Sequence, residues 1–254
     1  VAGCHPDLVP ELVALVAPIV KAQCDKVDSV EDGLIQNPAA CDFRPERDLP
    51  RCDGDTSDGK CFTDAQVETL SVLLTAVTDE DGNVVQPGFS VSEVQASSFI
   101  TPQRPDDLAA KDPFPNSDNG SLSGGYWPLA DAFLKVFVHK NDPAFYTRSI
   151  ISFKEGGSGD VTAYRTVVPK AEVELVSREA AMTIGHNPED IDKLIQLDRK
   201  FLIWHNLSDQ VLTPYMSINY YKQLAKQYDG YDNVQKNIRL FAVPGTGHCS
   251  MMGV

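Results

Sequence analysis

The sequence predicts an α/β fold built on a parallel sheet, and three neighbouring segments near the C-terminus carry this prediction. Residues 201–204 (FLIW) and 238–243 (IRLFAV) are short, almost wholly apolar runs, which is typical of strands buried on both faces. Residues 214–228 predict a helix between them, with Pro214 in the first turn, where its missing N–H costs nothing. A strand, a helix and a second strand form one βαβ unit, so the two strands should pair in parallel.

Composition limits the class of protein. The chain has 254 residues, a formal net charge of −14 and 42% hydrophobic residues, enough for a buried core in one large domain or two small ones. Basic residues are scattered, so the excess of negative charge disfavours nucleic acids and anionic membranes as partners. No run reaches the roughly 18 apolar residues of a membrane-spanning helix. Residues 8–22 lack the layout of a signal peptide.

Local patterns predict further elements upstream. Residues 10–23 have a broad apolar helical face, and residues 63–66 (TDAQ) resemble a capping box at the start of a second helix. Residues 81–83 (DGN) predict a turn, such as the tip of a hairpin. Residues 86–127 are rich in Pro, Gly, Ser and Asp and predict loop, whereas residues 129–139 predict another helix.

Two polar residues follow the predicted strands, at the sheet edge where functional groups gather. Asp209 comes after the first strand and His248 after the second, so neighbouring strands would bring the two together. A carboxylate beside an imidazole fixes its tautomer and stabilises the imidazolium, which is two-thirds of a hydrolytic triad. Taken singly, Asp209 is equally a turn residue and His248 a solvated loop residue. His205, at the end of the first strand, either lines this site or packs structurally.

The search for a nucleophile leaves the triad incomplete. The segments nearest to G-x-S-x-G are residues 88–92 (GFSVS) and 156–160 (GGSGD), and neither completes the pattern or follows a buried strand that feeds a helix. Ser123 and Ser250 fail likewise. We therefore expect the chain to hold an acid and a base without an activated serine.

The cysteines predict disulfides rather than zinc. Five of the six fall within the first 61 residues, and no two are nearer than nine positions, which disfavours a zinc site and favours an oxidising compartment. Cys249 directly follows His248, and it is either a buried free thiol or bonded to a cysteine outside the chain. Two Asn-x-Ser sequons, at Asn119 and Asn206, are compatible with secretion.

At these residues the chain resembles the tannase and feruloyl esterase family of secreted α/β-hydrolases. The resemblance runs in the family's order through residues 24–35 (CDKVDSVEDGLI), 41–43 (CDF), 61–67 (CFTDAQV), 201–214 (FLIWHNLSDQVLTP) and 239–249 (RLFAVPGTGHC). It departs from the family at Asn206, where glycine is usual, and at Thr246, where methionine is common. The family's Cys-Ser nucleophile segment is absent from this chain.

The resemblance implies a fold class and a function. The fold would be part of an α/β-hydrolase sheet, with parallel strands and helices at about residues 171–254, plus a loop-rich lid domain at about 5–170. The activity would be that of a secreted or periplasmic carboxylic ester hydrolase acting on galloyl or feruloyl esters, with Asp209 and His248 as two triad members. The third would be a serine in an N-terminal part of the enzyme, disulfide-linked through Cys249. The alternative is a non-catalytic, calcium-stabilised module of hydrolase shape that binds aromatic or glycan ligands.

The acidic segment after residue 24 predicts a structural calcium ion. Three aspartates within eight residues repel one another unless a cation neutralises them, and hard oxygen ligands in a loop suit calcium. An EF-hand does not fit, because Val30 would occupy the third position of its loop and Ala39 the last, where a bidentate Glu is expected. The resemblance instead implies the carboxylates of Asp25, Asp28 and Asp32 with the main-chain carbonyls of Val30 and Leu34. A solvated acidic turn is the alternative.

For the N-terminal cysteines we predict the pairs Cys24–Cys41 and Cys52–Cys61, each closing a short loop. The first pair would brace the calcium loop. The second would close an exposed acidic loop at residues 53–60. Cys4 has no assigned partner, and a Cys4–Cys24 pair stays open.

Overall fold

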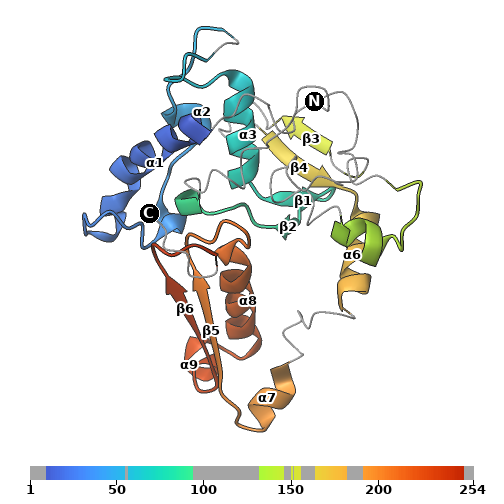
Figure 1. Ribbon diagram of the computed structural model, residues 1–254. Helices are drawn as coiled ribbons and strands as arrows, with labels where there is room; N and C mark the ends of the chain where they lie inside the picture. The colour runs from blue at the N-terminus through green and yellow to red at the C-terminus, as the bar shows by residue number, and fades with distance from the viewer. Residues whose placement is uncertain are drawn as a thin grey trace.

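The computed structural model describes residues 10–54, 57–93, 132–145, 150, 152–155, 164–181 and 191–248 (Figure 1). The helical elements in these ranges are α1 (Pro10–Cys24), η1 (Asp25–Asp28), η2 (Pro38–Ala40), α2 (Pro45–Asp48), α3 (Asp64–Leu74), η3 (Val91–Glu93), the π-helix η5 (Phe133–Val138), α6 (Lys170–Ala181), α7 (Asp192–Gln196), α8 (Pro214–Gln227) and α9 (Tyr231–Val234). The strands are β1 (Val77–Asp79), β2 (Val84–Gln86), β3 (Ser152–Glu155), β4 (Tyr164–Val168), β5 (Phe201–Asn206) and β6 (Ile238–Val243).

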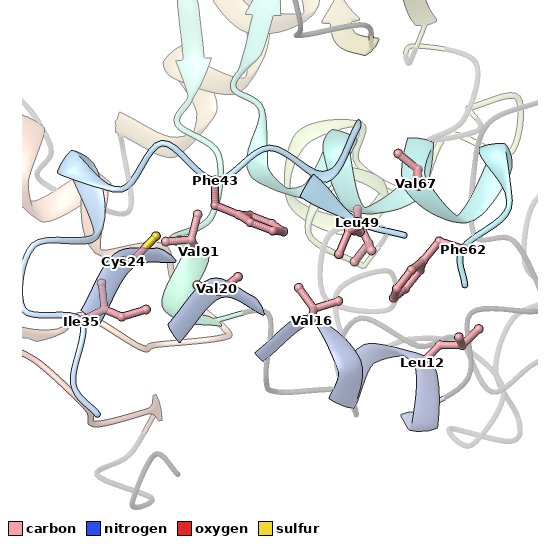
Figure 2. Close-up of a cluster of buried hydrophobic side chains, with 11 residues drawn as sticks. Leu12, Val16, Val20, Cys24, Ile35, Phe43, Leu49, Phe62, Val67 and Val91 are labelled. Carbon is pink, nitrogen blue, oxygen red and sulfur yellow. The ribbon is translucent and has the colours of Figure 1, made fainter. Parts of the chain in front are cut away.

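The first core forms where α1 packs against α2, α3 and the loops between them. The buried α1 residues recur every four positions, at 12, 16, 20 and 24, as one face of a helix requires. Figure 2 shows side chains of this cluster pointing toward one another; its buried members are Leu12, Val16, Val20, Cys24, Ile35, Phe43, Leu49, Phe62, Val67, Leu70 and Val91. The predicted capping box is present at α3, where the Thr63 side chain accepts from the Gln66 amide and Gln66 accepts from the Thr63 amide.

A second region is a small mixed sheet with the strand order β2-β1-β4-β3. The predicted turn at residues 81–83 joins β1 to β2 in an antiparallel hairpin, and the buried Asp79 accepts from the amides of Asp81 and Asn83. β1 pairs in parallel with β4, which pairs antiparallel with β3. Sequence patterns predict neither β3 nor β4. This sheet precedes residue 170, but the boundary between the lid and catalytic domains stays a prediction.

The third region is the predicted strand–helix–strand unit. β5 and β6 pair in parallel over six residues, from Phe201 opposite Ile238 to Asn206 opposite Val243, and α8 lies along the pair in Figure 1. The second core lies between the helices and this sheet; its buried members are Tyr221, Leu224, Ala225, Val234 and Ile238. The prediction of burial on both faces was wrong for this chain. Leu202, Trp204 and Phe241 are exposed, because the described helices contribute a core to one face only.

Residues 88–92 connect the first core to the strand–helix–strand unit. The Ser92 hydroxyl donates to the Leu207 carbonyl at 2.8 Å, and the Thr213 hydroxyl donates to the Gly88 carbonyl at 2.9 Å. No side chain fits at Gly88, since a Cβ would lie 2.1 Å from the Leu74 carbonyl oxygen. The turns after β5 are thereby fixed to the N-terminal core.

The predicted helix at residues 129–139 is described from Ala132 onward, where it forms the π-helix η5. Most of the predicted loop at residues 86–127 lies outside the described residues. None of the helices in the described ranges has the length and apolar character needed to cross a membrane.

Candidate active site

Asp209 lies in the turn after β5, and that turn is built around its carboxylate. Oδ1 accepts hydrogen bonds from the backbone amides of Val211 and Leu212, both at 2.9 Å. A side chain that bonds to its own turn in this way is typical of aspartate. The residue is only 6% exposed, so the carboxylate is held in one position and nearly removed from solvent.

His248 lies in the loop after β6, and its ring faces Asp209. The parallel register places Asn206 opposite Val243, so the two strands end at the same level. Nδ1 of His248 is 3.1 Å from each carboxylate oxygen of Asp209, while 31% of the histidine side chain is exposed. The two polar residues that follow neighbouring strands in the sequence therefore meet at one sheet edge.

The environment of Asp209 keeps its carboxylate ionised. Burial would raise the pKa of Asp209, but hydrogen bonds from the Leu212 amide, from His248 and from the Val211 amide outweigh burial and lower it below the ordinary value of 3.8. An ionised carboxylate only accepts, so Nδ1 of His248 carries the hydrogen. No hydrogen bond within the described residues engages Nε2, the nitrogen that then carries the lone pair. A ring in this tautomer is set to act as a general base.

His205 also contacts the acid. Its Nε2 is 3.0 Å from the Leu212 carbonyl oxygen and 3.6 Å from Oδ2 of Asp209, and its Nδ1 is 2.7 Å from the Ser217 hydroxyl on α8. Because a carbonyl only accepts, Nε2 carries the hydrogen and Nδ1 accepts from Ser217. His205 therefore lies beside the acid and is also packed, with both nitrogens engaged.

The hydroxyls of residues 88–92 are not placed to act as a nucleophile. Ser90 is fully buried, and its Oγ lies 2.8 Å from that of Ser92, which donates to the Leu207 carbonyl. A serine nucleophile needs an accessible oxygen beside a base. The other serines considered, at residues 123, 158 and 250, lie outside the described residues.

The loop that carries His248 packs on the acidic loop near the N-terminus. Gly245 has a φ of +66°, and the Leu34 Cδ2 atom lies 2.6 Å from the position that a Cβ at residue 245 would occupy. The positive φ favours glycine there, and a Cβ would push the end of the Leu34 side chain aside. The position of the histidine loop thus depends on a residue of the predicted calcium loop.

Within the acidic loop, the predicted calcium ligands accept hydrogen bonds from backbone amides instead. Asp25 accepts from Asp32 and Gly33, Asp28 from Val30 and Gln36, and Asp32 from Leu34. In the described part of the chain, no group of three or more His, Cys, Asp or Glu side chains is arranged to hold a metal ion. In this arrangement the three carboxylates accept from amides of their own loop and are not gathered around a common point. The calcium site stays a prediction, and no step at Asp209 and His248 depends on it.

Both predicted N-terminal disulfides are present. Cys24 bonds to Cys41 and Cys52 to Cys61, with Cα–Cα distances of 5.2 and 5.0 Å. The first closes the segment that contains the acidic loop, and the second closes the acidic stretch at residues 53–60, whose described residues are mostly exposed. Cys4 and Cys249 lie outside the described residues.

Two side chains at this site make contacts that no sequence motif predicts. Asn206 donates from Nδ2 to the Gly247 carbonyl at 2.7 Å, and Gln210 accepts at Oε1 from the His248 amide at 3.0 Å. A sequon and a departure from the family's usual glycine both single out Asn206, but neither predicts this contact, and its Nδ2 donates inside the fold. The strand register alone would have placed Asn206 near the loop after β6.

A buried, ionised carboxylate that orients an imidazole at the carboxyl ends of two parallel strands is the arrangement expected for the acid and the base of an α/β-hydrolase. Sequence comparison is consistent with that class. A family profile described as "Tannase and feruloyl esterase" matches residues 3–253. The chain belongs to the tannase and feruloyl esterase family.

Individual relatives support the same conclusion and are longer than this chain. An uncharacterized esterase of Xanthomonas campestris pv. campestris is 26% identical over 245 residues, covering 89% of this chain and 37% of that protein. A probable feruloyl esterase of Arthroderma benhamiae is 27% identical over 232 residues, covering 91% and 37%. The crystal structure of feruloyl esterase B from Aspergillus oryzae has the same fold, with a TM-score of 0.69 at 19% identity over 98% of this chain and 42% of that one. The chain thus spans about two fifths of the length of these proteins.

Proposed function

We propose that this chain is part of a serine-type carboxylic ester hydrolase that cleaves esters of aromatic acids, of the galloyl or feruloyl kind. The observation that carries the proposal is the ring of His248. Its Nδ1 lies 3.1 Å from both carboxylate oxygens of Asp209, and no described residue engages its Nε2. The substrate class comes from the family description and from relatives named as feruloyl esterases.

The pair would act as base and then as acid. Nε2 of His248 would take the proton of a serine hydroxyl while that oxygen attacks the ester carbonyl carbon. The Asp209 carboxylate would stabilise the imidazolium that forms. As the tetrahedral intermediate collapses, Nε2 would return the proton to the departing alcohol, which leaves the acyl group on the serine. Water, deprotonated by His248 in the same way, would then release the aromatic acid.

We place the serine in an N-terminal part of the enzyme outside this chain. The hydroxyls of Ser90 and Ser92 are buried and paired, and the chain spans only 37% of the curated relatives named above. Cys249, next to the base, would form the covalent link to that part. Such a bond would hold the nucleophile beside His248.

The exposed apolar face of the β5–β6 pair supports the proposal that a further part of the polypeptide packs there. Leu202, Trp204 and Phe241 are exposed there, with Trp204 64% exposed. Parallel sheets are usually covered on both faces, and a two-stranded sheet is marginal by itself. Elements from the N-terminal part would cover this apolar face and extend the sheet.

The two disulfides fit an enzyme that is secreted or periplasmic, because such bonds form and persist in oxidising compartments. We include this location in the proposal. Structural calcium in the acidic loop is a separate proposal, and binding would require Asp25, Asp28 and Asp32 to exchange amide partners for the ion.

Kinetics on the complete enzyme test the function. H248A should lower kcat on feruloyl or galloyl esters by at least about 10³-fold without changing the unfolding transition, because the general base is lost. An unmodified enzyme inert toward both esters would contradict the proposal and favour the non-catalytic binding module.

Electrophoresis of native material with and without reductant tests the partner. Reduction should release a second polypeptide that contains the nucleophile serine if the natural enzyme is cleaved into two. An unbroken enzyme should instead yield, after digestion, a disulfide-linked peptide pair that includes Cys249. Recovery of Cys249 as a free thiol would contradict the proposed link.

A further inference from the structure

The peptide bond between Gly247 and His248 is held at both of its polar groups by side chains from the end of β5 and the turn that follows it. The Gly247 carbonyl accepts from Nδ2 of Asn206 at 2.7 Å. The His248 amide donates to Oε1 of Gln210 at 3.0 Å. These two side chains flank Asp209, the residue that the His248 ring contacts.

The peptide is well placed to fix the ring. Gly247 is buried, so its carbonyl has little access to water and needs a donor from the protein. Two backbone bonds already join the same turns, from the Leu207 amide to the Val243 carbonyl at 2.7 Å and from the Ser208 amide to the Thr246 carbonyl at 3.2 Å. Those bonds end before His248. Asn206 and Gln210 are what orient the last peptide plane before the catalytic ring.

We propose that Asn206 and Gln210 are positioning residues that act as a clamp on the Gly247–His248 peptide and set the distance from Nδ1 to Asp209. This inference rests on the proposed function. A misplacement of about 1 Å at a reacting group costs on the order of 10²-fold in rate.

The two halves of the clamp make opposite chemical demands. Position 206 must donate a hydrogen bond to a carbonyl, which a carboxylate cannot do. Position 210 must accept from an amide, which a carboxylate does well. N206D and Q210E therefore add the same charge to the same turn, but only N206D removes the required hydrogen bond. N206A and Q210L remove each half without adding charge.

The test measures kcat, KM and the pH profile of kcat/KM on the complete enzyme, with kcat normalised to active sites by the acyl-enzyme burst. We expect kcat to fall about 30-fold or more in N206D and about 5-fold in N206A and Q210L, with KM nearly unchanged. The kcat of Q210E should fall by less than that of Q210L. In N206A, which adds no charge, the weaker contact between His248 and Asp209 should also move the acid limb of the pH profile to lower pH.

Two results would overturn the clamp. One is an N206A enzyme with the parent kcat and pH profile. The other is an equal loss in N206D and Q210E, which would mean that added charge, rather than the lost donor, is responsible. If the parent enzyme has no esterase activity, the proposed function fails separately. In that case crystal structures of N206D and Q210E test the clamp. An unchanged distance from His248 Nδ1 to Asp209 in both variants would refute it.

Discussion

The cysteine-rich region (residues 10–93) and the strand–helix–strand unit (residues 191–248) bury their apolar side chains in different ways. The first closes on itself: its core contains fully buried Phe62 and Leu70, and two disulfides close its loops. The second buries one side of its sheet and leaves Trp204 and Phe241 exposed on the other. The residues proposed for catalysis lie on the open unit. Under the proposed function, the closed region would serve as a support, and the open one would be the place where a further part of the enzyme completes the site.

The largest expected effect is at the acid of the open unit. D209N in the complete enzyme should lower kcat by about 10⁴-fold, because an amide can donate to Nδ1 and stabilise the wrong tautomer of His248. D198N is the matched control: Asp198 precedes β5 at the other end of the strand, and its side chain is exposed and paired with Lys200. Steady-state kinetics on the two variants check this prediction, and equal losses would contradict it.

A pair of aromatic truncations compares the two regions directly. F62A should lower the free energy of unfolding by about 3–5 kcal/mol, because it leaves a cavity in a closed core. W204A should cost a comparable amount in the complete enzyme if the open face is covered there. Denaturant unfolding of both variants measures the two costs. A loss under about 0.5 kcal/mol for W204A would mean that this face stays in solvent.

The third prediction concerns whether calcium stabilises the acidic loop of the closed region. If the acidic loop binds the ion, calcium at 100 times its Kd should stabilise the protein by about 2.7 kcal/mol. D28A should remove this effect, since it deletes a predicted ligand that now accepts from the Val30 and Gln36 amides. Thermal unfolding with calcium and with chelator measures the shift. A calcium-dependent Tm that persists in D28A would place the ion elsewhere.

The smallest effect is the pH dependence that Asp209 contributes. The pKa of Asp209 is lowered in the folded protein, so its carboxylate adds stability above pH about 3.8, and this contribution is lost as the pH falls through the lowered value. D209N should therefore flatten the fall in unfolding free energy in that acid range. Unfolding curves at pH 2.5 to 5 for the parent and the variant compare the slopes, and identical slopes would contradict the assignment.

What could be predicted from the sequence depended on local signals. The apolar runs at β5 and β6 and the polar residues after them predict the parallel pair and the meeting of Asp209 with His248. The small mixed sheet could not be predicted, since β4 pairs with β1 across nearly ninety residues, as Val167 does with Thr78. Burial of the β5–β6 sheet was predicted wrongly, because apolar composition does not reveal which polypeptide covers a face.

Side-chain hydrogen bonds were the second feature that could not be predicted from the sequence. The density of aspartates in the acidic loop indicates cation binding, yet the structure satisfies these carboxylates with amides of the same loop. No sequence pattern predicts the contacts of Asn206 and Gln210 with one peptide, because these contacts depend on how two turns face each other. Such contacts follow from three-dimensional arrangement and leave no periodicity to detect.

The contact between Leu34 and Gly245 has a consequence for how these sequences diverge. A larger residue at position 245 would need a strained backbone, and the side chain at position 34 would have to move aside or be smaller. The two sites are more than two hundred residues apart, yet substitutions at one should be accompanied by substitutions at the other across species. Covariation at these positions would identify the loop that carries the histidine in proteins whose sequences there are otherwise too divergent to align.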